Sequence, residues 1–371
     1  MSRFLLVFII LILSIACAKD EPKVNQEVDE VPFAVTILAK QGATDFQIDL
    51  LSDGTLGAPV NLFQKLELPE SFNKTIVRDQ LVSFHAWLRN DYSSHQIDLS
   101  TDGVMINRNY CFNEDSFEVV GIDNSQKYLA FISASVEASG ATTFSLNVYD
   151  QVADECRSSV IPTIGFPSNF SARGDYFILF QQDSSDNREL LVYDMKDLSL
   201  DRITLTTDYN FSVNDDQNLY IFSRNGSYQV LDLENLSLIN AGSNQIFENP
   251  ITDGILDITI QDGKMAFFVL NPQPSTIVSS PLIYDFTSNT VIGDGKALFK
   301  LIDELEKQVQ SPISIKTFKI NLSTEQVVVG YNYFKDASTE IGGVAYIDFE
   351  GTLIYNKEID FTPNQFVLRS N

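Results

Sequence analysis

Residues 191–194 read Leu191-Val192-Tyr193-Asp194, a short apolar run that ends in an aromatic residue and an aspartate. The chain contains seven such runs, each followed by a polar turn. The other six end at Asp49, Asp98, Asp150, Asp232, Asp285 and Asp348, at spacings of 38 to 63 residues. β-Branched and aromatic residues favour strands, whereas Asp, Asn, Gly and Ser favour turns. Each copy therefore predicts a strand and a tight turn, which the aspartate stabilises by hydrogen bonds to backbone N–H groups.

A second hairpin precedes most of these runs. Its turns fall at 78–79, 123–125, 173–175, 214–216, 261–263 and 323–325, and an apolar strand such as Tyr128-Leu129-Ala130-Phe131 follows each turn. Each unit thus reads as four antiparallel strands, with a period of about 40–50 residues. Such units are the blades of β-propellers. The sequence predicts an all-β chain folded as a seven-bladed β-propeller over residues 32–371.

The first unit is incomplete, because it begins at Pro32-Phe33-Ala34-Val35 and supplies only three strands before Leu62. We expect Gln365-Phe366-Val367-Leu368 to provide its innermost strand. Pairing of the N- and C-terminal strands would close the ring and remove two exposed sheet edges. A β-sandwich or two smaller β domains is the alternative.

The Tyr-Asp that ends several of these strands resembles the Trp-Asp of WD-repeat propellers. This resemblance extends over nearly the whole folded chain and implies the fold alone. The Gly-His dipeptide of that family is absent, and His85 and His95 are the only histidines. We therefore expect the family's Asp–His–Ser/Thr network to be absent.

The N-terminus predicts export. Residues 1–16 combine Arg3, an apolar run from Phe4 to Leu13 and a small-residue cleavage region, which together are typical of a signal peptide. An uncleaved anchor is the alternative, although the run is shorter than the roughly 20 residues of a membrane span. Leu13-Ser14-Ile15-Ala16-Cys17 resembles the lipobox of bacterial lipoproteins, with Ser14 where the commonest form has Leu. The resemblance implies lipidation of Cys17.

Residues 17–31 predict a flexible acidic tether, because they contain no aromatic residue and are rich in Asp, Glu, Lys and Pro. Lys19-Asp20-Glu21 resembles the export signal of Bacteroidota surface lipoproteins. That resemblance implies an outer-membrane lipoprotein facing the extracellular side. An ordinary acidic tether is the alternative.

Charge and cysteine content restrict the partners and the compartment. The chain has 25 Lys and Arg against 50 Asp and Glu, a net charge of −25, which argues against nucleic-acid binding. With Cys17 lipidated, Cys111 and Cys156 are left as an even pair, which suits one disulfide in an exported protein. We place both in inter-blade loops on one face; two free thiols are the alternative. We expect a monomeric ring.

The longest insertions predict a binding face, since loops on a rigid scaffold concentrate binding residues. They are 86–94, 133–143, 240–254, 271–281, 293–312 and 332–342. The candidate ligand-binding residues in or beside the loops are Trp87, Arg89, Tyr92, Arg108, Tyr110, Arg157, Tyr209, Tyr331 and Tyr333. Aromatic and Arg side chains are typical of binding surfaces; packed loop aromatics are the alternative. Residues 297–310 predict a helix whose apolar stripe packs against the ring rather than docking a partner.

The sequence offers no catalytic constellation. Two histidines make a histidine-based metal site improbable, and phosphate-binding glycine loops and a Gly-x-Ser-x-Gly elbow are missing. We expect no cofactor and no metal. The leading hypothesis is a non-enzymatic propeller that binds a small molecule, glycan or protein. The alternatives are a polysaccharide hydrolase or lyase with carboxylates in the channel, and a scaffold subunit of an envelope or nutrient-uptake complex.

Overall fold

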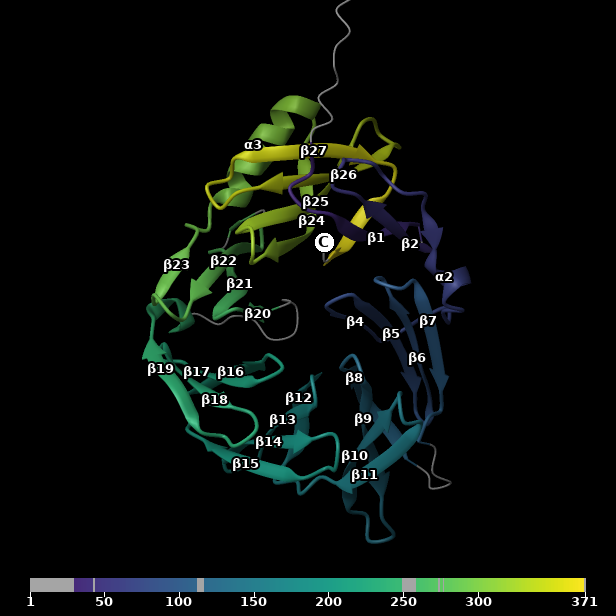
Figure 1. The fold of residues 1–371 in the computed structure, drawn as a ribbon, viewed down its shortest axis with the longest axis vertical. Coiled ribbons are helices and arrows are strands. Elements are labelled where there is room, and N and C mark those ends of the chain that lie inside the picture. Colours follow the sequence, from purple (N-terminus) through teal and green to yellow (C-terminus); the bar gives the residue numbers. More distant parts are fainter. Residues whose placement is uncertain are drawn as a thin grey trace, which may run out of the picture.

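Seven four-stranded antiparallel sheets form a ring in the computed structural model, which confirms the predicted seven-bladed β-propeller (Figure 1). The structure describes residues 30–42, 44–111, 117–248, 258–272, 274–275 and 277–369. The predicted signal peptide, the lipidation site Cys17 and nearly all of the predicted tether lie outside these residues. Among the described residues, no helix has the length and apolar character needed to span a bilayer.

The blades are numbered in chain order, and the strands of each run from the innermost outward. Blade 1 contains β28 (Thr362–Leu368), β1 (Val35–Gln41), β2 (Thr44–Leu50) and β3 (Val60–Asn61); blade 2 contains β4 (Lys74–Arg78), β5 (Leu81–Leu88), β6 (Asp91–Asp98) and β7 (Gly103–Arg108); blade 3 contains β8 (Glu118–Asn124), β9 (Tyr128–Val136), β10 (Thr142–Asp150) and β11 (Glu155–Val160); blade 4 contains β12 (Phe166–Arg173), β13 (Tyr176–Gln182), β14 (Arg188–Asp194) and β15 (Leu200–Leu205). Blade 5 contains β16 (Tyr209–Asn214), β17 (Asn218–Ser223), β18 (Ser227–Asp232) and β19 (Leu238–Ser243); blade 6 contains β20 (Thr259–Gln261), β21 (Lys264–Leu270), β22 (Ser279–Asp285) and β23 (Thr290–Ile292); blade 7 contains β24 (Ile313–Asn321), β25 (Gln326–Phe334), β26 (Glu340–Ile347) and β27 (Leu353–Ile359).

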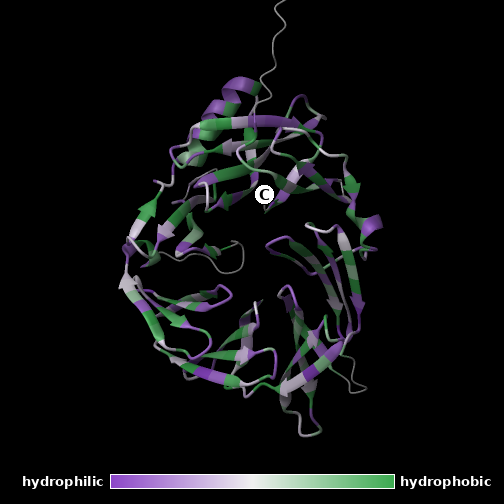
Figure 2. Cartoon of the chain, viewed as in Figure 1, coloured by the Kyte–Doolittle hydropathy of each residue, from purple (hydrophilic) through white to green (hydrophobic). Residues whose placement is uncertain are grey.

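The hydrophobic core lies between neighbouring blades rather than at the centre of the ring. One cluster, for example, joins Ile132 and Val148 of blade 3 to Phe177 and Leu191 of blade 4. The middle strands β9, β13, β17, β21 and β25 are apolar on both faces, because each is covered by a blade on either side. The outer strands are largely exposed or partly buried, as in β11 and β19. Hydrophilic and hydrophobic residues mix along this rim (Figure 2).

Ring closure occurs as predicted. Strand β28 pairs antiparallel with β1 from Thr362 to Leu368, with Ile37 opposite Phe366 and Val35 opposite Leu368. Ile37 and Phe366 are both buried, in a cluster that also contains residues of blade 7. The C-terminal strand therefore completes the first blade and packs it against the last one.

The repeated aspartates have the predicted turn role in six blades. Asp98 Oδ1 accepts a hydrogen bond from the N–H of Ser100 at 2.9 Å, and Asp194 accepts from Lys196 at 2.8 Å. Asp150, Asp232, Asp285 and Asp348 accept equivalent bonds from N–H groups two to four residues later. Asp49 differs, because its carboxylate accepts from the Thr36 hydroxyl and pairs with Arg369 at 3.0 Å. Arg369 directly follows the closing strand, so its ion pair reaches Asp49 across β1.

Helix α3 (Ala297–Val309) confirms the predicted helix and its packing. Leu298, Leu301 and Leu305 are buried between blades 6 and 7, and the opposite face is hydrophilic (Figure 2). Strand β23 pairs only with Ile283–Asp285, so the first half of β22 has no fourth strand beside it among the described residues. The helix contacts β22, whose residues Ser279 to Tyr284 are all buried. The other helices of the described residues are the short α2 (Leu62–Lys65) and the 3-10 turn η1 (Gln245–Glu248).

Candidate ligand-binding face

One face of the ring carries the turns between second and third strands together with the connections between blades; it is called the loop face below. Several insertions predicted there are strand for most of their length. Within 86–94, β5 continues to Leu88 and β6 begins at Asp91; within 332–342, β25 continues to Phe334. The prediction of long loops at these two places is therefore wrong. Side chains in them alternate between the two blade faces, so Tyr92 and Tyr333 are buried whereas Leu88 and Phe334 are exposed.

Tyr92 and Tyr110 are buried between blades 2 and 3, so they are not surface groups of a ligand site. Their ring centroids lie 5.0 Å apart in an edge-to-face arrangement, and the Tyr92 ring lies 4.7 Å from that of Phe131. The Tyr92 hydroxyl donates to the carbonyl oxygen of Tyr110. Burial raises the pKa of both hydroxyls far above the usual value. This cluster joins two blades.

A buried polar network lies beside that cluster. His85 Nδ1 lies 2.7 Å from the Ser94 hydroxyl, and Nε2 lies 3.0 Å from Oδ1 of Asn124 in blade 3. The Ser94 hydroxyl is in turn 3.1 Å from that of Tyr110. These partners fit a neutral His85 that donates from Nε2 and accepts at Nδ1. We expected no Asp–His–Ser/Thr network of the WD type. The structure contains a different histidine network, made by His85, Ser94 and Asn124, which the sequence did not predict.

The same two blades are joined covalently. Cys111 and Cys156 form a disulfide with their Cα atoms 5.3 Å apart. Cys111 follows β7, as expected, but Cys156 lies inside β11, beside the turn from β10. The placement of Cys156 in an inter-blade loop of the loop face is therefore wrong. The blades twist, so that the outer strand of blade 3 passes close to the segment that leaves blade 2.

Tyr331 and Tyr333 are also buried, in blade 7. The Tyr331 hydroxyl donates to Asn356 Oδ1 at 2.7 Å, and that of Tyr333 donates to Glu358. Burial raises the pKa of both hydroxyls to about 12. A Cβ at Gly343 would lie 2.1 Å from the Tyr331 ring, so only glycine leaves space for it. The expectation of an exposed aromatic surface is wrong for these two residues as well.

The other predicted residues are scattered around the ring. Trp87 is half-buried against the Tyr92 cluster, and Arg89 is exposed at the β5–β6 turn with φ 60°. Arg108 pairs with Glu67 at 2.9 Å, on the outer side of blade 2. Arg157 of β11 pairs with Glu155 at 3.0 Å. Trp87, Tyr92 and Tyr110 come together, but with each other rather than around a cavity.

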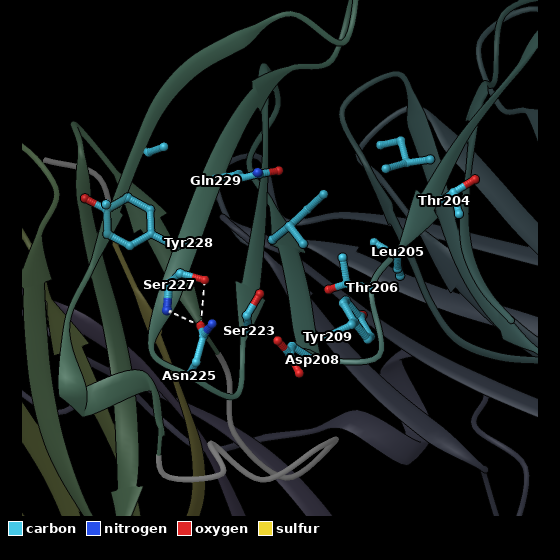
Figure 3. Close-up of a pocket in the computed structure, with 14 residues that line it drawn as sticks. Thr204, Leu205, Thr206, Asp208, Tyr209, Ser223, Asn225, Ser227, Tyr228 and Gln229 are labelled. Atoms are coloured by element: carbon cyan, nitrogen blue, oxygen red, sulfur yellow. Dashed lines mark hydrogen bonds between the residues drawn. The ribbon is translucent and has the colours of Figure 1, made fainter. Parts of the chain in front are cut away.

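Tyr209, one of the predicted residues, lines a pocket. The pocket has a volume of about 390 Å³ and opens between blades 4 and 5, on the loop face (Figure 3). Its walls are strand β15 with the connection to β16 on one side and strands β17, β18 and β19 on the other. The lining residues are Ile203, Thr204, Leu205, Thr206, Asp208, Tyr209, Ile221, Ser223, Asn225, Ser227, Tyr228, Gln229, Ala241 and Gly242.

Hydrogen bonds hold the pocket walls in place. Arg188 Nη1 donates to the carbonyl oxygen of Thr207 at 2.7 Å, and the Arg224 N–H donates to that of Asp208 at 2.7 Å. Across the pocket, Asn225 Oδ1 accepts from the N–H and the hydroxyl of Ser227, at 3.0 and 2.7 Å (Figure 3). The site is therefore formed by short, braced segments. The sequence did not predict this pocket, because its residues lie in strands and short turns rather than in long insertions. The polar run Thr206-Thr207-Asp208 next to Tyr209 was a usable signal.

The pocket contains few groups for acid–base chemistry. Asp208 is the only carboxylate among its lining residues, which include no histidine, lysine or arginine. Across the described residues, no group of three or more His, Cys, Asp or Glu is placed to hold a metal ion. The pocket instead provides hydrogen-bonding side chains next to apolar side chains such as Ile203, Leu205 and Ile221.

This chain has low similarity to the known proteins compared with it. No protein-family model matches the sequence, and no curated protein does. Among solved structures, the computationally designed Ika8 protein has a TM-score of 0.41 at 10% identity, covering 91% of this chain and 90% of its own. The Cps50 (Swd1) β-propeller domain of Myceliophteria thermophila has a TM-score of 0.39 at 12% identity, covering 77% and 86%. BamB from Moraxella catarrhalis has a TM-score of 0.36 at 12% identity, covering 78% and 91%.

Proposed function

We propose that this protein is an outer-membrane lipoprotein whose propeller binds a ligand or partner on its loop face without catalysing a reaction. The observation that carries the proposal is the braced pocket between blades 4 and 5, which is open on the loop face and holds several uncommitted hydrogen-bonding groups. Ligand pockets of proteins are concave, largely preformed and lined by apolar residues with a few placed polar groups. The pocket fits this description.

The anchor rests on residues 1–17, which combine a signal peptide with a lipobox-like segment ending at Cys17. Radiolabelled palmitate should enter the wild-type protein and not Cys17→Ala. Equal labelling of the two would contradict the anchor. Surface exposure is tested by biotinylation with a membrane-impermeant reagent: intact cells should be labelled, and labelling only after the outer membrane is permeabilised would place the ring on the inner side.

Binding is favoured over hydrolysis at this pocket. Glycosidases need two carboxyl groups, at about 5 to 9.5 Å from each other. The pocket lining supplies Asp208 alone. The purified full-length protein should therefore leave a panel of neutral polysaccharides intact over a long incubation. Release of reducing ends that Asp208→Ala abolishes would overturn this part of the proposal.

A scaffold role is the second candidate, and exposed apolar side chains at the loop face favour it. Leu88, Val136, Phe166, Val278 and Phe334 lie at the loop-face ends of strands in five blades, and each is more than half exposed. Aromatic and aliphatic side chains of this kind are common anchors of protein interfaces. The five residues, which we call the apolar rim, are spread around the ring rather than gathered in one patch.

The two candidates are separated by cross-linking in intact outer membranes, followed by purification of the full-length protein. A scaffold should yield one defined partner, which Leu88→Glu with Phe166→Glu loses. Val152→Glu is the matched control, because Val152 is 80% exposed but lies in the β10–β11 turn on the opposite face. Loss of the partner in both variants would argue against the apolar rim.

A further inference from the structure

The pocket between blades 4 and 5 has free hydrogen-bonding capacity of a particular kind. Within the described part of the chain, the side chains of Thr206, Asp208, Ser223 and Gln229 make no hydrogen bond or ion pair, although all four line the pocket. Two are hydroxyls and one is an amide, so three of the four groups can both donate and accept. Only the carboxylate of Asp208 is restricted to accepting.

This lining is unsuited to an anionic ligand. No lysine, arginine or histidine lines the pocket, and the guanidinium of Arg188, which braces the β15–β16 connection, is already engaged. It contacts Asp186 at 2.8 Å and the carbonyl oxygen of Thr207 at 2.7 Å. Recognition of carboxylate, sulfate or phosphate in proteins depends on charge-assisted donors. A ligand with such a group would lose its hydration here and would meet the free carboxylate of Asp208.

The lining also matches an ammonium ligand poorly. An ammonium group donates only, and it is best held by several acceptors such as carboxylates and carbonyls. Asp208 is the single charged acceptor, and the hydroxyls of Thr206 and Ser223 would each leave a donor hydrogen without a partner. A ligand rich in hydroxyl groups leaves no such mismatch, because a hydroxyl accepts from one neighbour and donates to another.

The floor of the pocket supplies apolar area. Ile203, Leu205 and Ile221 come from the partly filled interface between the two blades, and Ala241 and Gly242 form the wall at strand β19. A Cβ at Gly242 would lie 2.6 Å from the Tyr228 hydroxyl oxygen, so a larger residue there would displace Tyr228. Apolar patches next to alternating donors and acceptors suit a ring that has C–H groups on one face and hydroxyls at its edge.

The pocket is also preorganised, which lowers the entropic cost of binding. The segment from Thr206 to Tyr209 is closed by the Tyr209 N–H bond to the Thr206 carbonyl, at 3.1 Å, and is fixed to blade 5 by the Arg224 bond described above. The volume of about 390 Å³ lies near the lower end of the range for small-ligand pockets, which is about 300 to 1,000 Å³.

We infer that this pocket binds a neutral polyhydroxylated ligand, a mono- or disaccharide unit, with Asp208 accepting from two adjacent hydroxyls and Gln229 and Ser223 bonding to others. The inference rests on the proposed binding function and names its ligand class. It assigns Asp208 a binding role in which its charge strengthens the hydrogen bonds it accepts.

The test is calorimetric titration of the full-length lipoprotein in detergent with three sets of probes. These are neutral sugars (glucose, galactose, mannose, maltose and cellobiose), an amine (putrescine) and acidic sugars (glucuronate and glucose 6-phosphate). At least one neutral sugar should bind, while putrescine and the acidic sugars should not. Asp208→Ala should weaken that binding by at least tenfold. Asp201→Ala is the matched control, because Asp201 is an exposed acid of strand β15 that does not line the pocket.

Other results overturn the inference in recognisable ways. Binding of putrescine alone would assign the pocket to cationic ligands, and binding that survives both Asp208→Ala and the pocket-filling variant Gln229→Trp would place the sugar elsewhere. Unchanged melting temperatures show that the variants are folded. A third result is that no sugar binds, while a protein partner binds to Gln229→Trp but not to the apolar-rim variant Leu88→Glu with Phe166→Glu. The inference then fails, and the proposed binding function stands. If neither ligand nor partner is found, both fail.

Discussion

Nη2 of Arg78 lies 3.2 Å from Oδ1 of Asp123, and this pair joins blade 2 to blade 3 at the inner wall of the ring. Lys74 Nζ contacts the other carboxylate oxygen of Asp123 at 3.0 Å. Nε of Arg78 also lies 3.3 Å from the carbonyl oxygens of Asn124 and Ala172, so one side chain contacts three consecutive blades. Because Asp123 is almost fully buried, its two cations and its own backbone contacts must offset its desolvation.

Asp123→Ala should therefore lower the free energy of unfolding by about 3 kcal/mol or more, since it leaves two partly buried cations without their anion. Urea unfolding followed by circular dichroism measures the change. Asp102→Ala is the control, because it removes an exposed carboxylate that pairs with Lys65 and should cost less than about 1 kcal/mol. Equal losses in the two variants would show that the Asp123 pair is no more than a surface contact.

The buried His85 predicts a loss of stability in mild acid. Burial lowers its folded-state pKa to about 4, from 6.5 in the unfolded chain. Between these values the unfolded state binds a proton that the folded state does not, so the free energy of unfolding falls as pH decreases from about 6.5 towards 4. The contribution lost is about 3 kcal/mol at most, at roughly 1.4 kcal/mol per pKa unit.

This effect is measured by comparing urea unfolding at pH 7 and pH 5 for wild type and His85→Gln. The variant should be less stable at pH 7 and should have a shallower dependence on pH. His95, whose pKa is also lowered by burial, contributes in the same direction in both proteins. Identical pH dependences would exclude His85 as the titrating group.

Removal of the disulfide should destabilise the ring by about 2 to 4 kcal/mol, because Cys111 and Cys156 close a long loop that spans most of blade 3. The double variant Cys111→Ser and Cys156→Ser avoids leaving a single thiol. Its unfolding midpoint in urea should match that of the reduced wild type and lie below that of the oxidised protein. If the oxidised protein and the variant unfold at the same concentration, the bond contributes nothing to stability.

Substitution of Phe366 tests how much the closing strand β28 contributes to stability. The side chain is 1% exposed and packs between blades 1 and 7, so Phe366→Ala should cost about 3 to 5 kcal/mol. Asn364→Ala is the control on the same strand, because Asn364 is exposed at the register shift of β28 and has no strand partner in β1. Thermal unfolding should separate the two variants widely. A small loss for Phe366→Ala would show that closure of the ring does not depend on this strand.

The repeat pattern was enough to predict the blades, because each blade is a run of consecutive hairpins. The turn-forming residues of each hairpin lie within the same segment of sequence. The apolar stripe at helical spacing predicted α3, and the missing strand of the first unit predicted the closing strand. Burial of Tyr331 could not be predicted in this way, since it depends on Gly343 in the paired strand and on the neighbouring blade. The ligand pocket escaped prediction for a related reason. Its residues come from two blades, and no single segment of sequence contains more than part of it.

Strand β28 also governs when the fold can be completed. Strand β1 is the first of the described propeller strands to be synthesised, and its inner partner β28 is the last. Until then one edge of β1 has no partner, and an unpaired strand edge is a template for association with other chains. Contacts between distant parts of a chain also form slowly. We therefore expect the partly folded chain to associate with other copies unless it is kept separate from them until β28 has paired with β1. This holds on either side of a membrane.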